Sequence, residues 1–281
     1  MVVARSFSRT PTLSIPDFLE SLIRWKKSEP IEDRSCVFDV IAPLEFNENR
    51  DPRIDQIIEN EEELENYVNN NAYRINRRSL SNMCLNIAVP VAIVSIKLSS
   101  TASGTICNRL TKLTQPNPIA IDGVTVLTAA LSSLMRNDDI TVALKAATDS
   151  CKRPSILKHL TNCFKNAHPH GEDDLTREVH GENELPVDYL GIALQIAFYN
   201  LCHAKSFEEG IINAIEVGGD TATNASITGA VLGAKFGVSS IPEDWINTVV
   251  QAKLERHLTF PDVYFGDADN LVKLLILKGS L

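Results

Sequence analysis

The residues best suited to chemistry lie toward the C-terminal end, in the stretch GGDTATNA. Asp220 and Thr223 are three positions apart, so in a first helical turn they share a face and both present oxygen. Hard cations such as Mg²⁺ take carboxylate, hydroxyl and water ligands, and free N–H groups at a helix start attract anions such as phosphate. Gly218 and Gly219 would allow the tight turn that such a site needs. The same residues also describe a glycine turn followed by an aspartate helix cap, and both interpretations stand.

The elements that must position this stretch are helices, because apolar residues recur at helical rather than strand spacing along most of the chain. Ser14-Ile15-Pro16-Asp17 is a typical helix start, with a cap residue followed by proline and an acid. An acidic segment that begins at Glu61 leads into another predicted helix. Further helices are predicted over residues 85–98, 119–136, 140–150, 154–166, 187–203, 207–217, 223–236, 243–254 and 268–277. The sequence therefore predicts an all-α fold, as one domain over residues 1–281.

The helix that follows the GGDT stretch is rich in very small residues. Ala222 and Ala230 belong to one row spaced by four positions, and Gly229 and Gly233 belong to another. Glycine in a helix interior costs about 1 kcal/mol relative to alanine. The pattern predicts that neighbouring helices pack closely against both glycines and offset that cost.

Three segments have no clear helical period. Residues 1–13 are predicted to be disordered, although the two arginines and the lack of an acid in MVVARSFSRTPTLS also fit a short organelle-targeting segment. Residues 33–60 are predicted to be loop. Residues 168–184 are a polar loop that holds His168, His170 and His180 among acids; such a group could bind a transition metal or could be only a solvated loop.

Composition narrows the function classes. The net charge is -9 and the isoelectric point about 5.2, which argues against a nucleic-acid or membrane-surface binder, since both need a basic face. No apolar stretch is recognised that would span a bilayer. The six cysteines show no CxxC pair, which is typical of reduced thiols and predicts a cytoplasmic protein.

Longer stretches of the chain resemble one family. The run GGDTATNASITGAVLGAKFGVSSIPEDW is similar to the C-terminal signature of the ADP-ribosylglycohydrolases. Upstream, SNMCLNIAVP, LTQPNPIAIDGVTVLTAAL and YLGIALQIAFYNLCHAKSFEEGIINAIEVGGD resemble further family segments. The resemblance implies an orthogonal multi-helix bundle around a magnesium site. It also implies hydrolysis of the bond between ADP-ribose and a protein side chain or related group.

The resemblance assigns roles to seven residues of this chain. It implies that Asp220 and Thr223 are metal ligands. It also implies that five residues contact the substrate, with the diphosphate near the two helix starts: Ser81, Asn82, Gln115, Gly218 and Gly219.

The sequence also departs from the family pattern. Ala222 stands where the family has a second metal-binding aspartate, Gln115 where it has histidine, and Met83 where it has a substrate-loop glycine. A methyl group cannot coordinate a cation, and an amide does not titrate near neutral pH. The family's N-terminal Gly-Asp-Ala-x-Gly and Asp-Asp-Thr segments have no counterpart in this sequence.

Two functions follow as hypotheses. The first is a magnesium-dependent hydrolase that removes ADP-ribose from modified proteins or related conjugates, with a degraded site. The alternative is a non-catalytic protein on the same scaffold, which either binds ADP-ribose or is structural in the manner of a crystallin. The expected partners are ADP-ribose or an ADP-ribosylated protein.

Overall fold

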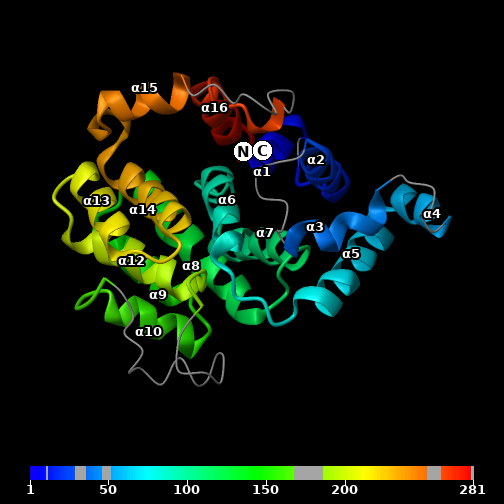
Figure 1. The fold of residues 1–281 in the computed structure, drawn as a ribbon, viewed down its shortest axis with the longest axis horizontal. Helices are drawn as coiled ribbons and strands as arrows, with labels where there is room; N and C mark the ends of the chain where they lie inside the picture. The colour runs from blue at the N-terminus through cyan, green and yellow to red at the C-terminus, as the bar shows by residue number, and fades with distance from the viewer. Residues whose placement is uncertain (11, 29–35, 46–51, 168–185, 252–260, 280–281) are drawn as a thin grey trace.

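The described part of the computed structural model consists of α-helices and short 3-10 turns (Figure 1). This part comprises residues 1–10, 12–28, 36–45, 52–167, 186–251 and 261–279. No strand occurs within these ranges; the one β-type contact is an isolated antiparallel bridge between Ser81 and Tyr189. The helices are α1 (Val2–Arg9), α2 (Ile15–Lys27), α3 (Cys36–Ile41), α4 (Arg53–Glu59), α5 (Glu61–Asn76), α6 (Ala88–Val94), α7 (Ser100–Lys112), α8 (Pro118–Met135), α9 (Ile140–Ser150), α10 (Pro154–Asn162), α12 (Leu190–His203), α13 (Phe207–Val217), α14 (Thr221–Phe236), α15 (Glu243–Gln251) and α16 (Ala268–Lys278). Short 3-10 turns are η1 (Ala42–Leu44), η2 (Asn82–Ile87), η3 (Val238–Ser240) and η4 (Pro261–Val263).

Helices α8 and α12 form the centre of the bundle because they are apolar on nearly every face. Asn117 accepts a hydrogen bond from the N–H of Ile119 and caps the start of α8, with Pro118 in its first turn. By length and composition α8 is the one described helix that could cross a membrane, yet 67% of it is buried inside the protein. It is the core helix of the bundle, contacted by α6, α7, α9 and α14.

Helix α14 packs against α12 and α13, and Ile227 and Val231 are among its buried residues. An added Cβ at Gly229 would lie 3.3 Å from Ile211 of α13, so the predicted close approach exists there. At Gly233 the prediction was wrong, because an added Cβ would meet nothing within 4 Å. Close packing therefore favours a small residue at Gly229 but not at Gly233, one turn further along the same face of α14.

Several boundaries differ from the sequence prediction. Residues 33–60 were predicted to be loop, but α3, η1 and α4 lie within them. The single helix predicted over 85–98 is instead η2 followed by α6, which ends at Val94. The predicted helix over 154–166 ends at Asn162, and the one over 187–203 begins at Leu190. The histidine-rich loop at 168–184 lies outside the described residues.

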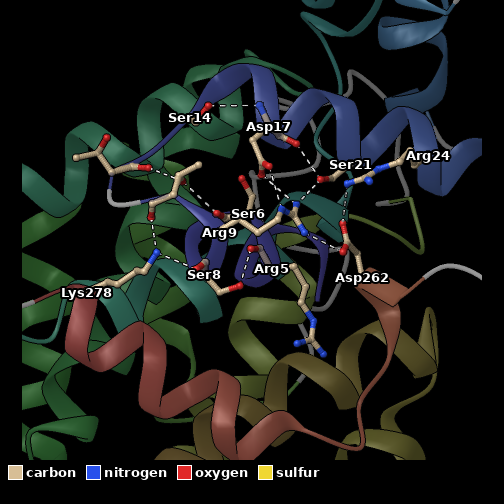
Figure 2. Close-up of polar contacts among 12 residues, drawn as sticks. Arg5, Ser6, Ser8, Arg9, Ser14, Asp17, Ser21, Arg24, Asp262 and Lys278 are labelled. Carbon is tan, nitrogen blue, oxygen red and sulfur yellow. Dashed lines mark hydrogen bonds and ion pairs between the residues drawn. The ribbon is translucent and has the colours of Figure 1, made fainter.

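The N-terminal residues differ most from the prediction, since α1 occupies part of the stretch that was expected to be disordered. Arg9 forms a two-bond ion pair with Asp17 of α2, at 2.9 and 3.0 Å, and an ion pair of 2.8 Å with Asp262 of η4 (Figure 2). The Nζ of Lys278 in α16 donates to the carbonyl oxygens of Ser8 and Thr10, both at 2.8 Å. We refer to α1, α2, η4 and α16 together as the terminal clasp.

The same clasp gives Arg5 a structural partner. Its guanidinium pairs with Asp267 just before α16 and donates to the carbonyl oxygen of Tyr264 at 2.9 Å. Both arginines that suggested a targeting segment thus hold the two ends of the chain together, where Figure 1 shows α1 beside α16.

Candidate functional site

The GGDT stretch forms a tight turn that ends in a capped helix. Gly218 has φ +83° and Gly219 has φ +73°, a left-handed conformation that glycine adopts without strain. Asp220 is the N-cap of α14, and its Oδ1 accepts a long hydrogen bond of 3.5 Å from the N–H of Thr223. An added Cβ at Gly218 would meet nothing within 4 Å. The turn is therefore as predicted, with open space at Gly218.

The second oxygen of Asp220 joins α14 to η2. Asn82 donates its Nδ2 to Asp220 Oδ2 at 3.0 Å and to Asn224 Oδ1 at 3.4 Å. Asn224 in turn donates to the carbonyl oxygen of Gly218 at 3.4 Å, which closes the turn from its other side. The structure thus brings together Asn82 and Asp220, which are 138 residues apart in the chain.

The η2 turn is itself held by the strap of residues 186–189 that leads into α12. The N–H of Asn82 donates to the Asp188 carbonyl at 2.7 Å, and the N–H of Leu190 donates to the Leu80 carbonyl at 2.9 Å. Between these bonds lies the bridge of Ser81 with Tyr189. Ser81 also caps η2, since its Oγ accepts from the N–H of Met83 at 3.5 Å.

Gln115 reaches the same region from the connection between α7 and α8. Its Nε2 donates to the carbonyl oxygen of Ser81 at 3.0 Å and to Ser79 Oγ at 3.1 Å. The side chain is fully buried, and its Oε1 has no hydrogen-bond partner in the described structure. Asn82 is only 2% exposed. From the buried side of the site, Gln115 therefore positions Ser81, and Asn82 positions Asp220.

The donor set is small for a metal ion. No group of three or more histidine, cysteine, aspartate or glutamate side chains with metal-binding geometry occurs among the described residues. Ala222 is exposed on α14 and offers only a methyl group. Asp220 and Thr223 supply one carboxylate and one hydroxyl, whereas Mg²⁺ prefers near-octahedral oxygen coordination. These residues fit Mg²⁺ only as a fragment of a larger site.

Beneath the strap lies a buried network of hydrogen-bonded polar side chains that was not predicted from the sequence. His159 Nδ1 lies 2.9 Å from Gln195 Oε1, and its Nε2 lies 3.2 Å from the Tyr189 hydroxyl. Because Gln195 donates its Nε2 to the Asn166 carbonyl at 3.1 Å, its Oε1 must accept, so His159 carries the proton on Nδ1. Burial raises the pKa of Tyr189, which keeps the phenol protonated. The residue in the sequence that could have indicated this buried network is Gly191, because a Cβ at that position would lie 2.2 Å from His159 Nε2.

A cavity of about 610 Å³ lies elsewhere, between α7, α8, the end of α9 and the connection that follows α9. None of the seven predicted site residues lines it. The candidate site therefore rests on the chemistry and contacts of Asp220, Asn82 and Ser81, and not on the position of this cavity.

Comparison with known proteins identifies proteins that are similar to this chain. A solved structure described as an ADP-ribosylglycohydrolase-related protein complex superimposes with a TM-score of 0.64 at 16% identity, over 99% of this chain and 78% of that one. That likeness confirms the all-α fold. The sequence model of the ADP-ribosylglycohydrolase family matches residues 1–277. The chain therefore belongs to the ADP-ribosylglycohydrolase family.

Two relatives share shorter segments. A putative ADP-ribosyl glycohydrolase of Acanthamoeba polyphaga mimivirus is 34% identical over 74 residues, which cover 26% of this chain and 22% of that protein. An uncharacterised protein of Archaeoglobus fulgidus is 45% identical over 51 residues, 18% of this chain and 16% of that protein. The matched segments thus span less than a quarter of either relative.

Proposed function

We propose that this chain binds ADP-ribose, free or attached to a protein, and hydrolyses it poorly or not at all. The observation that carries the proposal is the hydrogen bonding of the Asp220 carboxylate. Its one oxygen accepts from Asn82 and its other oxygen accepts from the α14 backbone. A carboxylate fixed in this way is an acceptor prepared for hydroxyl donors, such as those of a ribose. The open space at Gly218 gives a ligand access to it.

The charge of the site also favours a different position for each part of the ligand. Asp220 already places a negative charge at the start of α14, so a diphosphate is expected to lie toward Ser81 at the start of η2 and the ribose toward Asp220. Ser81 is partly exposed and can donate its hydroxyl to such a ligand. We propose that Gly219 frames the ribose side of the site, and that Asn82 and Gln115 act by holding these groups in place.

Poor hydrolysis follows from the small number of titratable groups. Glycoside hydrolysis ordinarily uses a pair of carboxyl groups or a metal-activated water. Among the described residues, the side chains that hydrogen-bond in the Asp220 network are amides, Asn82 and Asn224, which can neither give nor take a proton at neutral pH. Loss of several members of a cooperative site usually removes most of the rate.

The hydrolase itself is the second candidate, and one observation favours it. Asp220 remains as the N-cap of α14 and Thr223 lies in its first turn, so one carboxylate and one hydroxyl are available to a divalent cation if further ligands complete the shell. A bound Mg²⁺ would supply a Lewis acid there.

Binding is tested by thermal melting and calorimetric titration with ADP-ribose, with Mg²⁺ or a chelator present. The wild-type protein should be stabilised by about 2.7 kcal/mol at a ligand concentration a hundred times its Kd. Asp220→Asn keeps the shape but loses the charge, and should weaken binding at least tenfold. Asp149→Asn, on an exposed pair with Lys145, is the matched control and should bind as the wild type does.

Turnover is tested on the same preparations by release of ADP-ribose from an ADP-ribosylated peptide. Binding without release supports the proposal. Mg²⁺-dependent release that Asp220→Asn abolishes would replace it with the hydrolase. Absence of any stabilisation by millimolar ADP-ribose would overturn both and leave a structural protein.

The net charge of -9 supports a partner other than nucleic acid or an anionic membrane, and the five free thiols of the described part support a cytoplasmic location.

A further inference from the structure

A polar groove lies between α7, α8 and the end of α9. It consists of the cavity of about 610 Å³ and an adjoining one of about 480 Å³, which share five lining residues: Ser100, Gly104, Thr125, Asp149 and Ser150. Along α8 the lining residues lie on one face, from Pro118 to Arg136 at its C-terminal cap. At 1.5 Å per residue this face is about 27 Å long. Both cavities have the size of a small-molecule site.

Small side chains keep the groove open. Gly104 of α7 lies beside Thr125 of α8, and an added Cβ would lie 3.9 Å from Thr125 Cγ2, an ordinary contact distance. A side chain longer than alanine at this position would therefore extend into the groove. Glycine lowers the stability of a helix interior, so its place in the middle of α7 needs a reason, and the groove supplies one.

Three hydroxyl groups on the walls of the groove are arranged as acceptors. Thr105 and Thr125 donate to the carbonyl oxygens four residues earlier, at 3.0 and 2.8 Å, and Ser150 donates to the carbonyl oxygen of Ala147 at 2.8 Å. A hydroxyl that gives its proton to its own helix keeps its oxygen lone pairs for another donor. These three acceptor oxygens therefore suit a ligand that carries hydroxyl groups.

Ser95 adds a buried hydroxyl to the same groove. It lines the second cavity and is only 1% exposed, and its Oγ has no hydrogen-bond partner in the described part of the chain. Buried polar atoms in native proteins nearly always have a partner, so an exception needs an explanation. A polar ligand bound in the groove beside Ser95 would supply that partner.

Three positive charges lie at one end of the groove, where α7 ends and α10 begins. Lys112, Lys152 and Arg153 line this end, are exposed, and form no ion pair with any other described residue. The carboxylate of Asp122 is 5% exposed and fixes the connection, since it accepts from the N–H of Lys152 at 3.0 Å and of Arg153 at 2.9 Å. Arg153 is also the N-cap of α10 and makes no side-chain cap bond, so the positive end of that helix dipole reinforces the three cations.

We propose that this groove binds a phosphorylated sugar, with its phosphate beside the three cations and its hydroxyl groups along the three acceptor oxygens. A ligand with one anionic end and several hydroxyl donors matches both parts of the groove. Inorganic phosphate would use only the cations, and an uncharged sugar only the acceptors. The groove is separate from the site at Asp220, because none of the seven residues predicted for that site lines it. The two proposals therefore do not depend on each other.

Calorimetric titration of the whole chain with glucose 6-phosphate tests this proposal, with glucose and inorganic phosphate titrated separately. Glucose 6-phosphate should bind at least about tenfold more tightly than either, because it contacts both parts of the groove. Its affinity should fall as salt is added, since salt screens contacts between exposed charges. Equal affinities for glucose 6-phosphate and inorganic phosphate would overturn the proposal and leave an anion site. No binding at millimolar glucose 6-phosphate would overturn it as well.

Gly104→Leu fills the groove and leaves the three cations in place. Leucine is a better helix former than glycine, so the variant should fold and lose the binding of glucose 6-phosphate. Gly233→Leu is the matched control, because an added Cβ at Gly233 meets nothing within 4 Å, and it should bind as the wild type does. Asp220→Asn should also bind glucose 6-phosphate normally. Unchanged binding in a folded Gly104→Leu variant, or loss of binding in Asp220→Asn, would refute the assignment to the groove.

Lys152→Met gives a second readout that does not depend on filling the groove. It should weaken the binding of glucose 6-phosphate about threefold to tenfold and reduce the dependence of the affinity on salt. Lys273→Met removes an exposed charge of α16 that does not line the groove, and it should change neither quantity. If Lys152→Met has the affinity and the salt dependence of the wild type, the phosphate does not lie beside these cations and the proposal fails.

Discussion

The contact between Asn82 and Asp220 offers the most direct test of the candidate site. Asn82→Ala removes the donor to Asp220 Oδ2 at 3.0 Å and the donor to Asn224 Oδ1 at 3.4 Å, from a side chain that is 2% exposed. A hydrogen bond to a charged group contributes about 1.5–3 kcal/mol. We therefore expect the free energy of unfolding to fall by about 2–3 kcal/mol. At this chain size that corresponds to a loss of roughly 4–12 °C in Tm.

Asn86→Ala is the matched control, because Asn86 belongs to the same η2 turn but is exposed and donates only to the Met83 carbonyl at 3.3 Å. We expect it to change the free energy of unfolding by less than about 0.5 kcal/mol. Urea unfolding followed by far-ultraviolet circular dichroism measures both variants. Equal losses in the two variants would show that the Asn82 contact does not hold the turn, and our reasoning about the site would fail.

Asn82→Asp tests the effect of charge at the same position, because it adds a negative charge and leaves the shape of the side chain almost unchanged. It would place a second carboxylate about 3 Å from Asp220, and two like charges at 4 Å repel by about 4 kcal/mol at an effective dielectric of 20. The pair would avoid this by taking up a proton as the pH falls. The loss of stability relative to the wild type should therefore be largest above neutral pH and shrink toward pH 5. A loss that is the same at pH 5 and pH 8 would contradict the contact.

Two further predictions concern the bundle and its clasp. Gly191→Ala should destabilise the protein by about 1–3 kcal/mol because its Cβ would lie 2.2 Å from His159 Nε2, whereas Gly233→Ala, with nothing within 4 Å, should stabilise it by about 0.5–1 kcal/mol; melting curves of the two variants should shift in opposite directions. Although burial opposes ionisation of Asp17, hydrogen bonds and the charge of Arg9 outweigh it and lower the pKa of Asp17, so the stabilisation is present above the unfolded pKa and is lost as pH falls through the folded pKa. Arg9→Gln should therefore cost about 1 kcal/mol in urea unfolding at pH 6, and the cost should shrink as acid protonates Asp17; a cost that does not fall at acidic pH would contradict this.

Features that depend on neighbouring residues were predictable from the sequence. The bounds of α13 and α9 agree with the prediction, because Ser206 and Asp139 cap those helices and their partners lie three residues away. The turn at Gly218 and Gly219 was equally local. The family resemblance and the all-α fold were predicted from the same stretches and are confirmed by the comparisons.

Features that depend on distant contacts were not predictable. Helix α1 has only eight residues and is ordered by Asp262, Asp267 and Lys278, more than 250 positions away. The support of Asp220 by Asn82, and the burial of Gln115 under Ser81, likewise come from tertiary packing. The roles proposed for these residues stay predictions until ligand binding is measured.

The terminal clasp has a consequence for synthesis of the protein. An isolated helix of eight residues is not stable in water, so α1 must wait for its partners in η4 and α16. At about 5–20 residues per second, roughly 15 to 60 seconds separate the emergence of the first and last helices from the ribosome. Throughout that time Phe7 of α1, which is buried in the finished protein, lacks its final cover and is open to chaperones. Helix α1 is therefore synthesised before α16 but reaches its native place only after α16 has been made.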